Sequence, residues 1–130
     1  MENHTEAESM ITTIMLLFGL HFLCDLALQN DYMAQAKNRN TPLGKRDSVW
    51  VIVLTAHAAI HALAVLCVGL FYFMDAHRAI VITATLFTFI SHWVIDLLKC
   101  NNYLGYWTDQ FMHLLAMLVV TFLYVYKLNG

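Results

Sequence analysis

Charged side chains are scarce in this chain of 130 residues. They make up 12% of the sequence, about half of their share in an average soluble domain, whereas hydrophobic residues reach 60%. The net charge is −2, and there is no block of Lys and Arg that would favour binding to a nucleic acid. So much apolar surface must face a solvent other than water, and we expect a single domain that lies in a membrane.

Proline and cysteine are also rare. The single proline, Pro42, lies outside the long apolar runs, so no proline interrupts a helix within them. The three cysteines are odd in number and show no CxxC spacing, so we expect no disulfide framework. We interpret Cys24, Cys67 and Cys100 as small apolar side chains. The first nine residues lack Lys and Arg, unlike a secretory signal, and we expect the first apolar run to be retained.

Four apolar runs are long enough, or nearly so, to cross a bilayer as helices. They cover about residues 10–28, 49–73, 79–98 and 109–126, and a longer polar loop occupies 30–48. The sequence therefore predicts an all-α fold, a polytopic bundle of four transmembrane helices in one domain, 1–130.

Basic residues predict how the bundle is oriented, because Lys and Arg in short loops mark the cytoplasmic side. Five of them fall in the first and third loops, and two fall on the opposite side. Those in the first and third loops are Lys37, Arg39, Lys45, Arg46 and Lys99, and the other two are Arg78 and Lys127. We therefore expect both termini to lie in the periplasm and the protein to reside in a bacterial inner membrane.

Each predicted span contains one pair of His or Asp residues four positions apart. The pairs are His21 and Asp25, His57 and His61, His92 and Asp96, and Asp109 and His113. Random placement would give roughly one such pair, and residues at this spacing share one helix face. An aspartate facing lipid would cost on the order of 2.5–3.5 kcal/mol, so we expect all eight side chains to face the bundle interior.

The pairs also agree in depth. They lie near the C-terminal ends of the first and third spans and near the N-terminal ends of the second and fourth, which is one side of the membrane. Histidine and aspartate at this spacing are typical of metal ligands. Eight ligands exceed the needs of one tetrahedral ion, so we predict two divalent ions, with zinc favoured over iron.

Two alternatives need no metal. Buried His–Asp pairs can hydrogen-bond between transmembrane helices, and Asp109, which follows Thr108, could be a solvated helix cap. Three neighbouring residues have predicted supporting roles. Gln29 and Gln110 would orient ligands, and Lys99 would either pair with Asp96 or extend to the membrane interface.

The segments HFLCDLALQNDYMAQAK, HAAIHA, SHWVIDLLK and DQFMH follow one another in this order. Together they resemble a family of small bacterial and phage integral membrane proteins, the domain of unknown function 3307. The resemblance covers about residues 19–113 and includes the eight paired residues together with Gln29, Lys99 and Gln110. More distantly, the pattern is similar to that of membrane-bound metal-dependent hydrolases, which is an analogy of fold alone.

These patterns favour a metal-dependent hydrolase acting on a lipid or lipid-linked ester or phosphoester at the cytoplasmic leaflet. Asp25 or Asp109 would act as general base, and Lys99 would hold a phosphate. Alternatives are a di-iron lipid oxidase or hydroxylase, and a non-enzymatic accessory protein or transporter in which metal staples the bundle. Membrane lipid is the expected partner, and so short a chain could also form a homo-oligomer.

Overall fold

The computed structural model describes residues 6–72 and 78–128, and these parts of the chain are almost entirely helical. Four long helices dominate, and no strand occurs among the described residues. They are α1 (Glu6–Phe22), α4 (Val49–Tyr72), α5 (Arg78–Cys100) and α6 (Tyr106–Leu128). Each belongs to a segment long and apolar enough to cross a membrane. The predicted all-α bundle with four membrane-spanning helices is thus confirmed.

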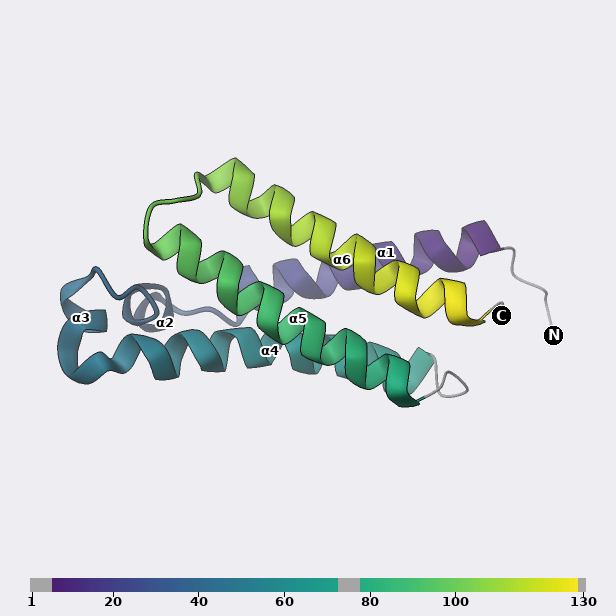
Figure 1. Cartoon of the computed structure of the whole chain (residues 1–130), viewed down its shortest axis with the longest axis horizontal. Coiled ribbons are helices and arrows are strands. Elements are labelled where there is room, and N and C mark those ends of the chain that lie inside the picture. The colour runs from purple at the N-terminus through teal and green to yellow at the C-terminus, as the bar shows by residue number, and fades with distance from the viewer. Residues whose placement is uncertain (1–5, 73–77, 129–130) are drawn as a thin grey trace.

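The four helices form a ring in which α1 lies between α4 and α6, and α5 also contacts both (Figure 1). The start of α1 and the end of α6 lie at one end of the bundle. The segment between α1 and α4 and the connection from α5 to α6 lie at the opposite end. Successive long helices therefore alternate in direction, as the depth argument requires.

The segment expected to be a loop, 30–48, contains two short helices and a 3-10 turn, Arg46–Ser48. Helix α2 (Asp31–Ala36) begins after Asn30, whose side chain accepts a hydrogen bond from the Met33 amide at 2.8 Å. Helix α3 (Pro42–Lys45) begins after Thr41, which caps it in the same way. The spacing of apolar residues did not reveal either helix because each is less than two turns long.

The ends of the long helices differ from the predicted spans. Helix α6 begins at Tyr106 rather than at 109, because the amide of Asp109 already donates to the Gly105 carbonyl at 3.0 Å. The end predicted for the second span, Phe73, lies outside the described residues.

The bundle interior divides into an apolar half and a polar half. The apolar half is packed by Leu17, Val65, Val68, Val81, Ala84, Val120 and Tyr124. Side chains on the outer faces, such as Met15, Ile52 and Phe71, are large, apolar and exposed, as suits contact with lipid. The polar half holds the histidines and aspartates described below.

Close packing in the apolar half depends on Gly69 of α4. A Cβ atom at this position would lie 2.6 Å from Val81 Cγ1 and 2.7 Å from the Tyr124 hydroxyl oxygen. That hydroxyl donates to the Val65 carbonyl at 2.9 Å. A side chain at 69 would therefore displace both a packed valine and a hydrogen-bonded tyrosine.

We predict that Gly69→Ala destabilises the protein by about 1–3 kcal/mol, the usual cost of overpacking a core. The measurement is reversible unfolding in detergent. Gly19→Ala is the matched control, because a Cβ added at Gly19 of α1 would meet open space among the described residues. Equal stability losses in the two variants would contradict this account of the packing.

Candidate metal centre

The structure brings all eight paired residues together in the polar half of the bundle. All five histidines of the pairs, with Asp96 and Asp109, are buried. The eighth residue, Asp25, has a side chain 21% exposed. The other two histidines of the sequence, His4 and His77, lie outside the described residues.

Asp25 reaches this cluster from a π-helical turn, Leu23–Ala27, which continues α1. The turn closes with a hydrogen bond from the Leu28 amide to the Leu23 carbonyl at 3.1 Å. Turns of this type insert one extra residue into a helix and are frequent at functional sites. The apolar run predicts a regular helix over this segment, so the position of the turn is a structural finding.

The Asp25 carboxylate faces three histidines from two helices. Its Oδ2 lies 3.2 Å from His21 Nε2. Its Oδ1 lies 3.3 Å from His57 Nε2 and 3.1 Å from His61 Nε2. No lysine or arginine contacts Asp25 among the described residues, so its polar neighbours are these three imidazoles.

The Asp96 carboxylate lies on the other side of His57. Its Oδ2 is 3.4 Å from His57 Nε2 and 3.8 Å from His92 Nε2, and its Oδ1 is 3.4 Å from His113 Nε2. His57 therefore lies between two carboxylates, one from the end of α1 and one from α5.

The imidazole rings crowd together. The rings of His61 and His92 are stacked with centroids 3.7 Å apart, and the His113 centroid lies 4.3 Å from that of His92. His21 completes the group, 4.9 Å from His61 and 5.0 Å from His113 by ring centroid. Five imidazoles from four helices thus direct Nε2 atoms towards the shared carboxylates.

These distances are compatible with ligands of a shared metal ion, although the contact of His61 Nε2 with Asp25 Oδ1 at 3.1 Å is also a hydrogen bond. Around a tetrahedral ion with bonds of about 2.0–2.1 Å, neighbouring ligand atoms lie about 3.3–3.4 Å apart. Six of the seven His–Asp distances lie between 3.1 and 3.5 Å. Although within reach of carboxylates, the buried Nε2 atoms of His21, His57 and His92 have no hydrogen-bond partner among the described residues. Buried polar atoms rarely lack a partner, and a shared cation would satisfy them.

The potential ligand atoms fall into three overlapping groups. One contains Asp25, His57, His61 and His92, the second contains His21, His92 and His113, and the third contains Asp96, Asp109 and His113. The first is the strongest candidate because it offers one carboxylate and three imidazoles, enough for a tetrahedral ion. The two carboxylates of the third group are already paired with lysines, which makes it the weakest.

Lys37 is one of these lysines, and the sequence analysis missed its role. Its Nζ donates to Asp96 Oδ2 at 2.6 Å, and both side chains are largely buried. The sequence alone predicts that Lys37 is one of the loop charges that orient the bundle. Helix α2 folds it back over the site, and Asn40 holds this segment by donating to the Cys100 carbonyl at 2.7 Å. The inclusion of Lys37 in the segment HFLCDLALQNDYMAQAK was the only available signal.

Lys99 is the other lysine. The expectation that it pairs with an aspartate of its own helix, Asp96, was wrong. Its Nζ donates to Asp109 Oδ2 instead. The short connection between α5 and α6, in which Asn102 has a φ of 61°, returns the chain so that Asp109 lies beside Lys99. With Lys37 already on Asp96, each lysine compensates one of these two aspartates.

Asp109 is fully buried in the first turn of α6, so the alternative of a solvated cap was wrong. Gln110 Nε2 donates to Asp109 Oδ2 at 3.0 Å, which agrees with a supporting role. Gln29 Oε1 is buried but has no hydrogen-bond partner among the described residues. The supporting role of Gln29 stays a prediction.

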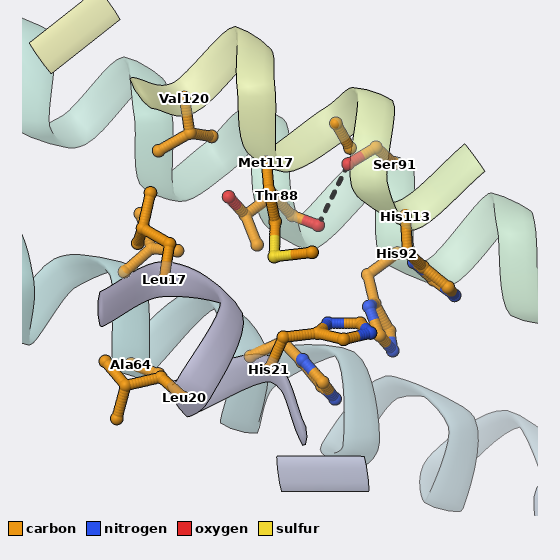
Figure 2. A pocket seen from close by; sticks show the side chains of 13 residues that line it. Leu17, Leu20, His21, Ala64, Thr88, Ser91, His92, His113, Met117 and Val120 are labelled. Atoms are coloured by element: carbon orange, nitrogen blue, oxygen red, sulfur yellow. Dashed lines mark hydrogen bonds between the residues drawn. The ribbon is translucent and has the colours of Figure 1, made fainter. Parts of the chain in front are cut away.

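A small cavity adjoins the histidines on the side of the apolar half. Its volume is about 30 Å³, room for one or two water molecules. Figure 2 shows His21, His92 and His113 at one end of the cavity and Leu17 and Val120 at the other. Water at this position would lie beside four candidate ligands, His21, His61, His92 and His113.

The model of one protein family, described as "Protein of unknown function (DUF3307)", matches residues 12–129. The match covers the motifs on which the resemblance was based and confirms it. No curated protein and no solved structure matches the chain. The more distant similarity to metal-dependent hydrolases therefore has no support from these comparisons.

We predict that Lys37→Met destabilises the protein by about 3–5 kcal/mol, because it leaves the buried Asp96 charge without its lysine. Thermal or denaturant unfolding in detergent measures the loss. Lys45→Met, an exposed lysine of the same segment, is the control and should have little effect. Adding Asp96→Asn to Lys37→Met should restore part of the lost stability. A Lys37→Met protein as stable as the Lys45→Met control would show that the ion pair is unimportant.

Proposed function

The chain belongs to the DUF3307 family of proteins of unknown function, and we propose that it is a membrane-embedded, metal-dependent hydrolase. Its substrate would be a lipid or lipid-linked ester or phosphoester at the cytoplasmic leaflet. The observation that carries the proposal is the set formed by Asp25, His57, His61 and His92 beside a water-sized cavity. A divalent cation in such a set lowers the pKa of a neighbouring water to about 7 and polarises a carbonyl or phosphoryl oxygen.

We propose two ions, with zinc preferred to iron. Imidazoles with one carboxylate are the ligands that zinc most often has in hydrolytic sites. The second ion would be bound by His21 and His113, and His92 would complete either this set or the first one.

The balance of charged side chains also supports the presence of at least one ion. When ionised, Asp25, Asp96 and Asp109 carry one negative charge more than Lys37 and Lys99 supply, and uncompensated charge is costly at this depth.

Within this proposal Asp109 is better suited than Asp25 to accept a proton. Lys99 and Gln110 hold its Oδ2, whereas its buried Oδ1 has no hydrogen-bond donor in the described part of the chain. His113, which lines the cavity, has its Nε2 3.5 Å from that Oδ1. Asp109 Oδ1 is therefore the carboxylate oxygen free to accept a proton from a water at the centre. Lys99 would hold Asp109 in place, and its half-exposed end could also meet a phosphate.

The test compares matched carboxylate-to-amide variants in purified protein. Asp109→Asn should retain its metal while kcat falls by about 10²–10⁴-fold, the usual contribution of a general base. Asp25→Asn should lose both metal and activity, since it removes the only carboxylate of the main set. Asp31→Asn, an exposed aspartate of α2, should change neither. Elemental analysis gives the metal and its stoichiometry, and phospholipids in mixed micelles are the substrates.

Several outcomes would contradict the proposal. Activity that survives complete chelation would exclude metal-dependent hydrolysis. Iron with an optical signature, in place of zinc, would favour oxidation of a lipid chain. The full burial of His57 and Asp109 favours a second candidate, a metal that only staples the bundle. A metal-loaded protein that is inert towards every lipid class, but unfolds more readily after chelation, would favour that staple.

We further infer that both termini face the periplasm and that α2, α3 and the α5–α6 connection face the cytoplasm. The basic side chains of Lys37, Arg39, Lys45 and Lys99 belong to that end of the bundle, and Arg78 belongs to the other. We predict that alkaline phosphatase fused to the C-terminus is active, and that green fluorescent protein fused there is not fluorescent. The reverse pattern would invert the orientation and move the site to the outer leaflet.

A further inference from the structure

A groove between α1 and α6 opens beside the candidate metal centre. Its volume is about 330 Å³, within the range of about 300–1,000 Å³ typical of small-molecule sites. Helix α1 contributes Phe18, His21 and Phe22, and helix α6 forms the facing wall. Both helices belong to membrane-spanning segments, so the groove faces the hydrocarbon of the bilayer rather than water.

The α6 wall runs along the membrane normal. Its lining residues Trp107, Gln110, Leu114 and Met117 recur at intervals of three or four and form one stripe about 15 Å long. Trp107 is 81% exposed in the first turn of α6, where tryptophan is typical of the membrane interface. The groove therefore extends from the interface towards the bilayer centre, as an acyl chain does.

Polarity changes along the groove. Gln110, which donates to Asp109, lies about one turn into α6, and beyond it the wall is apolar at Leu114 and Met117. On the α1 side the polar residue is His21, whose Nε2 lies 3.2 Å from Asp25 Oδ2. An amphiphile with its ester beside these two polar residues would place its chain against the apolar wall.

The groove also adjoins the candidate centre. His21 and Met117 line both the groove and the small cavity beside the histidines. These two side chains therefore lie between a molecule in the groove and a water in the cavity. His21 Nε2 is buried and has no hydrogen-bond partner among the described residues, so the residue that joins the two spaces is itself a candidate ligand.

We propose that this groove binds one acyl chain of a membrane phospholipid and presents the ester that joins the chain to glycerol at the level of His21 and Gln110. The identification of that lipid as substrate rests on the proposed function, whereas binding of the chain does not. In the reaction a water oxygen adds to the acyl carbonyl carbon and the bond from this carbon to the glycerol oxygen breaks. The proton released by the water passes to the glycerol oxygen, and the products are a fatty acid and a lysophospholipid.

The binding test uses full-length protein, first treated with chelator, in vesicles of phosphatidylethanolamine and phosphatidylglycerol. A small fraction of the phosphatidylethanolamine carries a diazirine on one acyl chain, either next to the carbonyl or near the middle of the chain. After illumination, we expect the first probe to label Gln110 or Phe111 and the second to label Leu114 or Met117. Labelling spread evenly over exposed apolar positions, such as Ile52 and Leu86, would overturn the proposal.

A pair of matched variants sharpens the test. Leu114→Trp fills the groove, whereas Leu115→Trp makes the same change at an adjacent, exposed position outside it. We expect the first to reduce labelling of α1 at Phe18 and Phe22 by about tenfold, and the second to leave it unchanged. Equal labelling of the two variants would overturn the proposal. If Leu114→Trp does not fold, the depth-resolved labelling of the unmodified protein decides alone.

The same material separates this inference from the proposed function. Groove labelling without any metal-dependent release of fatty acid would leave the chain-binding site in place and remove the hydrolase. Metal-dependent release of fatty acid without groove labelling would keep the hydrolase and overturn the site. Release of fatty acid by the Leu115→Trp protein, but not by the Leu114→Trp protein, would support both.

Discussion

The need to compensate ionisable groups inside a membrane controls this structure more than any other interaction. Five imidazoles and three carboxylates lie between the helices, and seven of these eight side chains are buried. The three aspartates contact different partners. Asp25 lies beside three histidines, Asp96 pairs with Lys37, and Asp109 pairs with Lys99. The aspartate without a lysine is the one in the group best suited to a metal. Because the two lysines already pair with Asp96 and Asp109, the site around Asp25 is the most favourable one for a cation.

The two halves of the bundle have different roles. In the apolar half, Gly69, Val81 and Tyr124 pack closely and hold the helices in register. In the polar half the same helices present side chains whose mutual distances suit a cation, and the Nε2 atoms of His21, His57 and His92 have no hydrogen-bond partner among the described residues. Rigid packing on one side can therefore hold an otherwise unfavourable cluster of polar groups together on the other, as preorganised sites require.

The segment between α1 and α4 does more than connect two spans. It includes the π-helical turn that carries Asp25 and the helix that carries Lys37, and Asn40 fastens it to the end of α5. This segment lies over the end of the site that carries Asp25 and Asp96, and the groove between α1 and α6 adjoins the site at His21. This arrangement is the basis of our proposal that an amphiphile reaches the centre through the bilayer.

The sequence by itself determined the four membrane helices, because runs of this length and apolarity can satisfy their backbone in lipid only as helices. It also determined the eight paired residues. A spacing of four places both members of a pair on one helix face, and that face must point into the bundle because polar side chains facing lipid are costly. Only the tertiary structure decided the partners of the lysines. Lys37 and Asp96 are 59 positions apart, and Lys99 pairs with Asp109 of α6 rather than with Asp96 of its own helix. The π-helical turn at Asp25, the caps that start α2 and α3, and the groove also depend on how the helices pack. Periodicity reports which face of a helix is buried but not what that face meets, so these features appear only when the four helices are placed together.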